Sequence, residues 1–182
     1  VMGQMRETVG PKPGEEPIDH YLRVLSDKTG SLIALAAEMG IRMAEGPESL
    51  IRPIRGFGEK IGIAFQLVDD VIDLSDRSAG TGKPPGTDVR RGVTTLPLLY
   101  LREEARKNPA AQQFLETLEQ GARGELTEKN FQIAIARLRN HEVTERTMVT
   151  AREMADQAIA HLEEAPSGQV KDALVRLADQ GG

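Results

Sequence analysis

Residues 62–74 read GIAFQLVDDVIDL, and this stretch decides how the rest of the sequence is interpreted. It is strongly apolar, yet it carries Asp69, Asp70 and Asp73 and no lysine or arginine. At about 100° per residue, the three aspartates and Gln66 share one helix face about 100° wide. Apolar side chains cover the remaining positions. The stretch therefore predicts a helix that is buried nearly all round, with one narrow acidic face.

Helical periodicity dominates the rest of the chain as well. One helix is expected from residue 18 to about residue 44, and a second from about residue 50 to residue 74. Thr95 and Pro97 indicate the start of a third helix, and three or four amphipathic helices follow it. The candidate core residues of the first helix are Leu22, Leu25, Leu32, Ile33, Ala36 and Met39. Strand-like alternation is nowhere sustained, so the predicted fold class is all-α.

The segment 75–88, SDRSAGTGKPPGTD, has no large apolar side chain and contains three glycines and two prolines. We expect a long exposed loop of the kind that is usually kept for a function. Lys83 lies within it, where small neighbours allow a backbone and a lysine to approach an anion closely.

Composition excludes several other classes of protein. The 182 residues carry a net charge of −5, which disfavours general nucleic-acid binding. The absence of cysteine excludes disulfides and thiolate chemistry. No apolar run approaches the roughly 20 residues of a membrane span, and no signal segment opens the chain. We expect a soluble cytoplasmic protein, and the opening VMGQMRETVG, which lacks an initiator methionine, reads as the start of a fragment.

Buried carboxylates lose several kcal/mol of hydration unless a partner compensates them. One possible partner is an arginine or lysine from a neighbouring helix. The other is a divalent cation, because carboxylates at positions i, i+1 and i+4 suit Mg²⁺, which keeps coordination positions for substrate phosphates. The acidic helix alone leaves both possibilities open.

Two further features favour the cation. Lys28 and Thr29 lie within an otherwise apolar helical stretch, SDKTGSL, and Lys83 lies in the glycine-rich loop. An isolated Lys28 would be read as a surface lysine whose stem covers apolar neighbours. Together with the acidic cluster, however, separate lysines and a long loop are the components of a magnesium–diphosphate site.

At this point the sequence resembles the trans-isoprenyl (polyprenyl) diphosphate synthase family. The stretch GIAFQLVDDVIDL is similar to the second aspartate-rich motif of that family. The segments KTGSLI, GKPPGTDVRRG and TTLPLLYL match the family in order and spacing, and the resemblance extends from about residue 3 to the end of the chain.

The resemblance implies an all-helical isoprenoid synthase bundle and a homodimer. It implies an Mg²⁺-dependent enzyme that condenses an allylic prenyl diphosphate with isopentenyl diphosphate into a longer polyprenyl diphosphate. Lys28 and Lys83 would bind the allylic diphosphate, and Thr29 and Gln66 would face the developing cation. The metal side would comprise Asp69, Asp70 and Asp73. Stabilising the charge that develops on the leaving group agrees with these roles.

Two departures from the family pattern bear on function. Val93 stands where many relatives carry a lysine, and Arg90 or Arg91 is a candidate to replace it. The family's first aspartate-rich motif has no counterpart in residues 1–60. Residues 1–182 therefore read as the C-terminal portion of a single prenyl synthase domain. The rival interpretation is a non-catalytic regulatory subunit of a heteromeric synthase, which the intact second motif disfavours.

Overall fold

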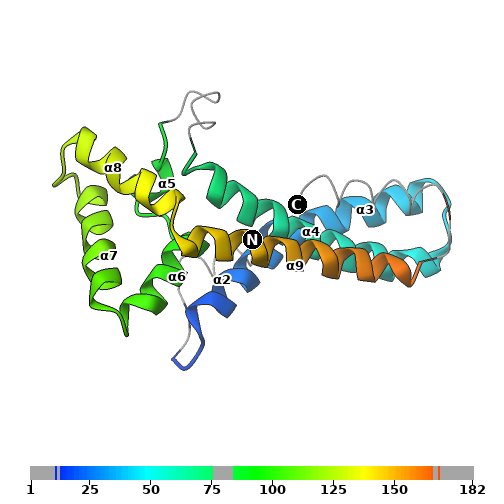
Figure 1. Cartoon of the computed structure of the whole chain (residues 1–182). Helices are drawn as coiled ribbons and strands as arrows, with labels where there is room; N and C mark the ends of the chain where they lie inside the picture. The colour runs from blue at the N-terminus through cyan, green and yellow to red at the C-terminus, as the bar shows by residue number, and fades with distance from the viewer. Residues whose placement is uncertain (1–10, 12, 76–83, 166–167, 169–182) are drawn as a thin grey trace. The chain divides into compact units, whose positions relative to one another are not determined.

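The computed structural model describes residues 11, 13–75, 84–165 and 168, and every regular element in this part of the chain is helical. The predicted all-α fold is confirmed (Figure 1). The chain forms two compact units, one of residues 1–66 and 150–182 and the other of residues 67–149. None of the described helices is long and apolar enough to cross a bilayer.

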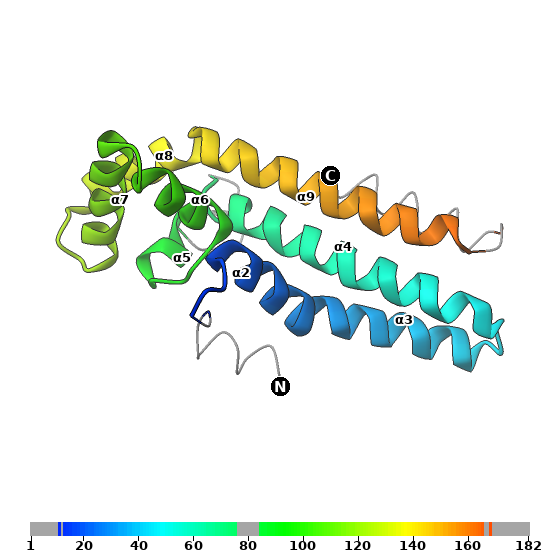
Figure 2. The ribbon, with the colours of Figure 1, turned by 90° about the horizontal axis from the view of Figure 1, so that it is seen from below.

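The first unit contains the helix that was predicted from residue 18 to about residue 44. It comprises α2 (Pro17–Leu25), the π-helical turn η1 (Ser26–Gly30) and α3 (Ser31–Met43). The short η2 (Glu48–Leu50) leads into α4 (Ile51–Ile72), close to the predicted bounds. The last helix that the structure describes is α9 (Glu142–Glu163), and α4 lies between α3 and α9 (Figure 2).

A small apolar core joins these three helices. Its buried residues are Ile41, Ile54, Phe57, Ile61, Ala64, Ala155, Ala158 and Leu162. Those contributed by α9 recur at intervals of three and four, as the helical pattern predicts. Burial of this face, rather than helix propensity alone, stabilises the helices.

Glycines allow α4 to approach the preceding helix at backbone distance. A Cβ atom added to Gly30 would lie 2.7 Å from the carbonyl oxygen of Glu59, and one added to Gly58 would lie 2.7 Å from Cα of Ala34. A Cβ on Gly62 would lie 2.8 Å from Cα of Gly30. The missing side chain of Gly62 leaves room that the turn η1 occupies.

The expected core of α3 is also partly wrong. Ala34 and Ile41 are buried against the neighbouring helices, but Leu32 is 65% exposed and Met39 is 53% exposed. Ala36 is exposed as well. The large exposed side chains follow one face of the helix, which we call the α3 stripe: Leu32, Leu35, Met39 and Met43. Apolar periodicity identifies a face that is suited to burial, but it does not identify what covers that face.

The acidic helix is less enclosed than its sequence predicts. Leu67 and Leu74 are buried, whereas Phe65 and Ile72 are more than a third exposed. The prediction of a helix buried nearly all round is therefore wrong for the described part of the chain. The polar face remains, with Asp69 exposed and Asp70 half-buried.

The second unit contains α5 (Thr87–Arg90), α6 (Leu96–Ala105), α7 (Pro109–Ala122) and α8 (Glu128–Arg139). Thr95 is the N-cap of α6, so the predicted start of this helix is confirmed. Asn108 and Thr127 cap α7 and α8 with their side chains. The short α5 begins inside the segment that was predicted to be a loop, so the loop ends earlier than expected.

Candidate functional site

The carboxylate of Asp70 stabilises the start of α6. The backbone N–H of Leu96 donates a hydrogen bond to Oδ2 of Asp70, with an N···O distance of 2.9 Å. The N-cap residue itself, Thr95, makes no capping bond with its side chain. Asp70 therefore takes the place of a local cap and satisfies a backbone donor that the helix cannot satisfy internally.

Asp73 holds the segment that follows the loop. The backbone N–H of Asp88 donates to Oδ2 of Asp73 at 3.1 Å, and the backbone N–H of Gly86 donates to its carbonyl oxygen at 2.8 Å. Gly86 has a positive φ of 76°, a backbone conformation that glycine adopts without strain. Two backbone donors thus fix the chain beside the end of the acidic helix.

Asp69 has a different environment. Its side chain is exposed, and its pKa is raised by partial desolvation and, to a smaller extent, by the negative charge of Asp88. Asp88 is a further candidate site residue that was not predicted from the sequence, because the segment 75–88 was expected to be a loop. Recognising that a helix begins directly after Gly86 would have placed Asp88 in that helix rather than in the loop. The two carboxylates create a negative field that favours a cation.

Backbone N–H groups supply part of the compensation that the sequence analysis sought in a salt bridge or a metal ion. Asp70 and Asp73 both accept a hydrogen bond of this kind. Hydrogen bonds to an ionised carboxylate favour its charged form. These bonds fix the orientation of the Asp70 and Asp73 carboxylates, whereas Asp69 is the exposed member of the motif.

The first unit brings Lys28 and Thr29 close to the helix that carries Gln66. Both residues lie in the π-helical turn η1, whose Gly30 contacts Gly62 of α4. Gln66 follows Gly62 by one helical turn. Such π-turns are frequent at functional sites. Lys28 belongs to the first unit and the aspartates belong to the second. That they lie close together therefore stays a prediction.

The other candidate cationic residues of the site are Lys83, Arg90 and Arg91. Lys83 lies outside the described residues, so its predicted role is untested. Arg90, a candidate to replace the lysine missing at Val93, forms an ion pair with Glu128 at 2.6 Å and lies 4.1 Å from the ring centre of Phe131. Arg90 is therefore held by α8, while Arg91 is exposed.

The donor set agrees with a hard divalent cation. Carboxylate oxygens are the protein ligands that Mg²⁺ prefers, and Mg²⁺ is usually held by one or two of them together with substrate phosphates. Within residues 13–75 and 84–165, no three acidic or histidine side chains converge to form a complete metal site. The carboxylate oxygens of the motif are thus of the donor type that suits such a cation.

A hollow of about 470 Å³ in the first unit is the other candidate site. Its charged lining comprises Arg42, Arg52, Arg55, Glu48, Glu59, His161 and Glu164. Glu38 pairs with both Arg42 and Arg55, at 2.9 and 3.2 Å. Arg42 and Arg55 are thus paired with Glu38, and three further glutamates line the hollow, so it does not favour an anion in the way a diphosphate site must.

The fold is that of the all-α isoprenoid synthases. The chain superposes on a solved geranylgeranyl pyrophosphate synthase from Corynebacterium glutamicum, complexed with calcium and isoprenyl diphosphate, with a TM-score of 0.83. The two are 34% identical, and the match covers 100% of this chain and 55% of that one.

A family model described as polyprenyl synthetase matches residues 1–135, and the chain therefore belongs to the polyprenyl synthetase family. It is 31% identical over 176 residues to octaprenyl diphosphate synthase of Haemophilus influenzae, covering 97% of this chain and 52% of the relative. It is 44% identical over 105 residues to nonaprenyl diphosphate synthase of Mycobacterium tuberculosis, covering 58% of this chain and 31% of the relative. The chain spans about half the length of such relatives, or less.

Proposed function

We propose that this chain supplies the metal–diphosphate part of a prenyltransferase that joins an allylic diphosphate to isopentenyl diphosphate. The observation that carries the proposal is that the three aspartates have different environments. Backbone N–H groups hold Asp70 and Asp73, while Asp69 is exposed in the negative field of Asp88. Such a surface is preorganised for a cation that a diphosphate completes.

The residues have distinct roles in this proposal. Asp69, with Asp70 and Asp73, would hold Mg²⁺, which when bound withdraws charge from the leaving diphosphate. Lys28 and Lys83 would donate charge-assisted hydrogen bonds to the diphosphate oxygens. The hydroxyl of Thr29 and the amide oxygen of Gln66 would face the allylic cation as it develops. Family membership and the calcium and isoprenyl diphosphate in the Corynebacterium glutamicum structure support this assignment.

The organisation of the whole enzyme is part of the proposal. Residues 1–182 would form the C-terminal portion of a single prenyl synthase domain that acts as a homodimer in the cytoplasm. The match to about half of each longer relative supports this reading.

Binding of Mg²⁺ with inorganic diphosphate tests the proposal on the chain itself. Calorimetric titration should show binding to the unmodified chain and a loss of at least tenfold for Asp69→Asn, in line with the loss of a ligand interaction. Asp156→Asn removes an exposed carboxylate of α9 and is the matched control, with no expected effect. Equal affinity of the Asp69→Asn variant and the unmodified chain would contradict the proposal.

A further inference from the structure

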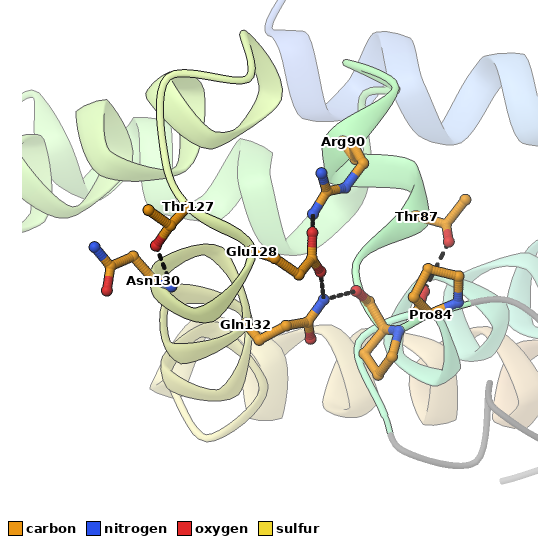
Figure 3. A network of polar contacts seen from close by, with 8 residues as sticks. Pro84, Thr87, Arg90, Thr127, Glu128, Asn130 and Gln132 are labelled. Carbon is orange, nitrogen blue, oxygen red and sulfur yellow. Dashed lines mark hydrogen bonds and ion pairs between the residues drawn. The ribbon is translucent and has the colours of Figure 1, made fainter.

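The segment that holds Asp73 is itself held by α8, through a chain of polar contacts (Figure 3). The side-chain amide of Gln132 donates to the carbonyl oxygen of Pro85 at 3.2 Å and to Oε1 of Glu128 at 3.0 Å. The other carboxylate oxygen of Glu128 accepts from Arg90 at 2.6 Å. One side chain of α8 thus reaches the start of the segment, and another reaches its end.

Packing fixes the same segment between those two points. A Cβ atom added to Gly86 would lie 2.5 Å from Cγ1 and Cδ1 of Ile135, so the backbone here rests directly on α8. Thr87 donates from its hydroxyl to the carbonyl oxygen of Pro84 at 2.7 Å, which closes a tight turn. The ring of Pro85 restricts its own φ, so little freedom remains once its carbonyl is held.

The contacts with Gln132 and Glu128 differ in strength. Arg90 and Glu128 form a pair of largely exposed side chains, and such pairs contribute little in water. Gln132 is half-buried, and both N–H groups of its amide are used. Removal of this amide would leave the carbonyl of Pro85 without this donor, whereas loss of the ion pair would be compensated by solvent.

We propose that Gln132 is a positioning residue that orients the Asp73 carboxylate through residues 85–88. The path consists of three hydrogen bonds. Gln132 donates to the carbonyl oxygen of Pro85. Further along the same backbone, the N–H of Gly86 donates to the carbonyl oxygen of Asp73, and the N–H of Asp88 donates to its carboxylate. Gln132 acts on the aspartate through the backbone, as an outer residue acts on a ligand. The consequence for metal binding rests on the proposed function, while the path itself does not.

Amide hydrogen exchange of the 182-residue chain tests the path. Gln132→Met has nearly the same length and no N–H donor, so the amides of Gly86 and Asp88 should exchange faster in this variant. Gln132→Lys supplies an N–H donor again on a flexible side chain that is one atom longer, and it should restore the protection. Asn130→Met is the matched control on α8, because this side chain points away from the segment in Figure 3. Unchanged exchange at Gly86 and Asp88 in Gln132→Met would overturn the proposal.

Titration with Mg²⁺ and inorganic diphosphate tests the consequence. Gln132→Met should weaken binding by about tenfold, the usual effect of removing an outer support of a ligand, and Gln132→Lys should recover it. Faster exchange with unchanged affinity would show that the hold on Asp73 does not serve the metal, and would overturn the positioning role. Absence of binding to the unmodified chain would remove the proposed function alone, because the exchange result still decides the path.

Discussion

The Asp70 carboxylate and the backbone N–H of Leu96 lie 26 positions apart in the chain and form a hydrogen bond of 2.9 Å. This bond ties the acidic motif to the start of the most enclosed helix of its unit, in which residues Leu96–Leu101 are all buried. The motif therefore contributes to the fold as well as to a candidate site. The two contributions can be separated by substituting each aspartate individually.

Asp70→Ala should destabilise the chain by about 1–2 kcal/mol, the usual cost of removing a side-chain cap. Asp70→Asn keeps an oxygen that can accept from Leu96, and its loss should be smaller. Urea denaturation followed by circular dichroism measures both free energies of unfolding. Equal losses for the two variants would show that the charge of Asp70, rather than its hydrogen bond, stabilises α6.

Asp69→Asn, in contrast to Asp70→Ala, should not destabilise the chain at neutral pH. The pKa of Asp69 is raised above the usual range of an aspartate by burial and by the charge of Asp88, so the unmodified fold loses stability as the pH rises through the folded-state pKa. Below the unfolded-state pKa the carboxyl is protonated in both states, and the variant should match the unmodified chain. Near neutral pH the variant should be slightly more stable, by an amount that exposure of the side chain keeps small.

Denaturation curves between pH 3 and pH 7 measure this difference. A variant that is less stable than the unmodified chain at neutral pH would contradict the sign. Asp88→Asn provides an independent check, because it removes the charge that contributes to the raised pKa. Carboxyl NMR should then report a lower pKa for Asp69.

The close approach of η1 to α4 gives a prediction with a matched control. Gly30→Ala places a methyl group 2.7 Å from the carbonyl oxygen of Glu59, and backbone atoms there cannot move away cheaply. We expect a loss of about 1–3 kcal/mol, as for other overpacked contacts. Gly40→Ala adds the same methyl group to α3 where no other atom lies within 4 Å, and should stabilise the helix by about 0.5–1 kcal/mol. A loss in both variants would mean that helix geometry, not the contact with Glu59, is the cause.

The α3 stripe should promote self-association of the isolated chain. Leu35 and Met39 are each 53% exposed and Met43 is 83% exposed, and an apolar surface of this kind favours burial against another molecule. Leu35→Glu combined with Met39→Glu should lower the apparent mass in light scattering at high concentration. The free energy of unfolding should change little, because neither side chain belongs to the core. Unchanged association of the double variant would show that the chain self-associates through another surface.

Local chemistry explains which parts of the structure could be predicted. Thr95 and Pro97 mark the start of α6 in the sequence because capping and the fixed φ of proline act within one turn. The hydrogen bond from Leu96 to Asp70 was not predictable, because it depends on how two distant segments pack. The exposure of Leu32 and Met39 was missed for a related reason: periodicity reports a face, and the element that covers it is not part of the pattern.

The candidate site shows the same division. The shared face of Gln66, Asp69 and Asp70 follows from helical spacing alone. The role of Asp88 follows from a four-residue helix that begins after a glycine with positive φ, inside a segment whose composition is typical of a loop. Composition therefore predicted a loop after the acidic helix but not the short helix α5 that begins within it.

The last prediction separates a catalytic half from a regulatory subunit. Residues 1–182 alone should catalyse no prenyl transfer, because no counterpart of the first aspartate-rich motif occurs in residues 1–60. Co-expression with the half of a synthase that this chain does not match should restore Mg²⁺-dependent condensation, measured with radiolabelled isopentenyl diphosphate. In that complex, Asp69→Asn, Lys28→Ala and Gln66→Ala should each lower the turnover number strongly, while Asp156→Asn should not.

The reason lies in where charge develops during the reaction. A catalytic half must stabilise the leaving diphosphate and the allylic cation, so loss of Asp69 or Lys28 should raise the barrier by several kcal/mol. A regulatory subunit would act through contact surfaces alone, and replacing these polar residues would leave turnover unchanged. An active complex that tolerates all three substitutions would thus assign the chemistry to the partner. We expect dependence on all three, because the second aspartate-rich motif is intact and includes Asp69, an exposed carboxylate that forms part of the negative field beside Asp88.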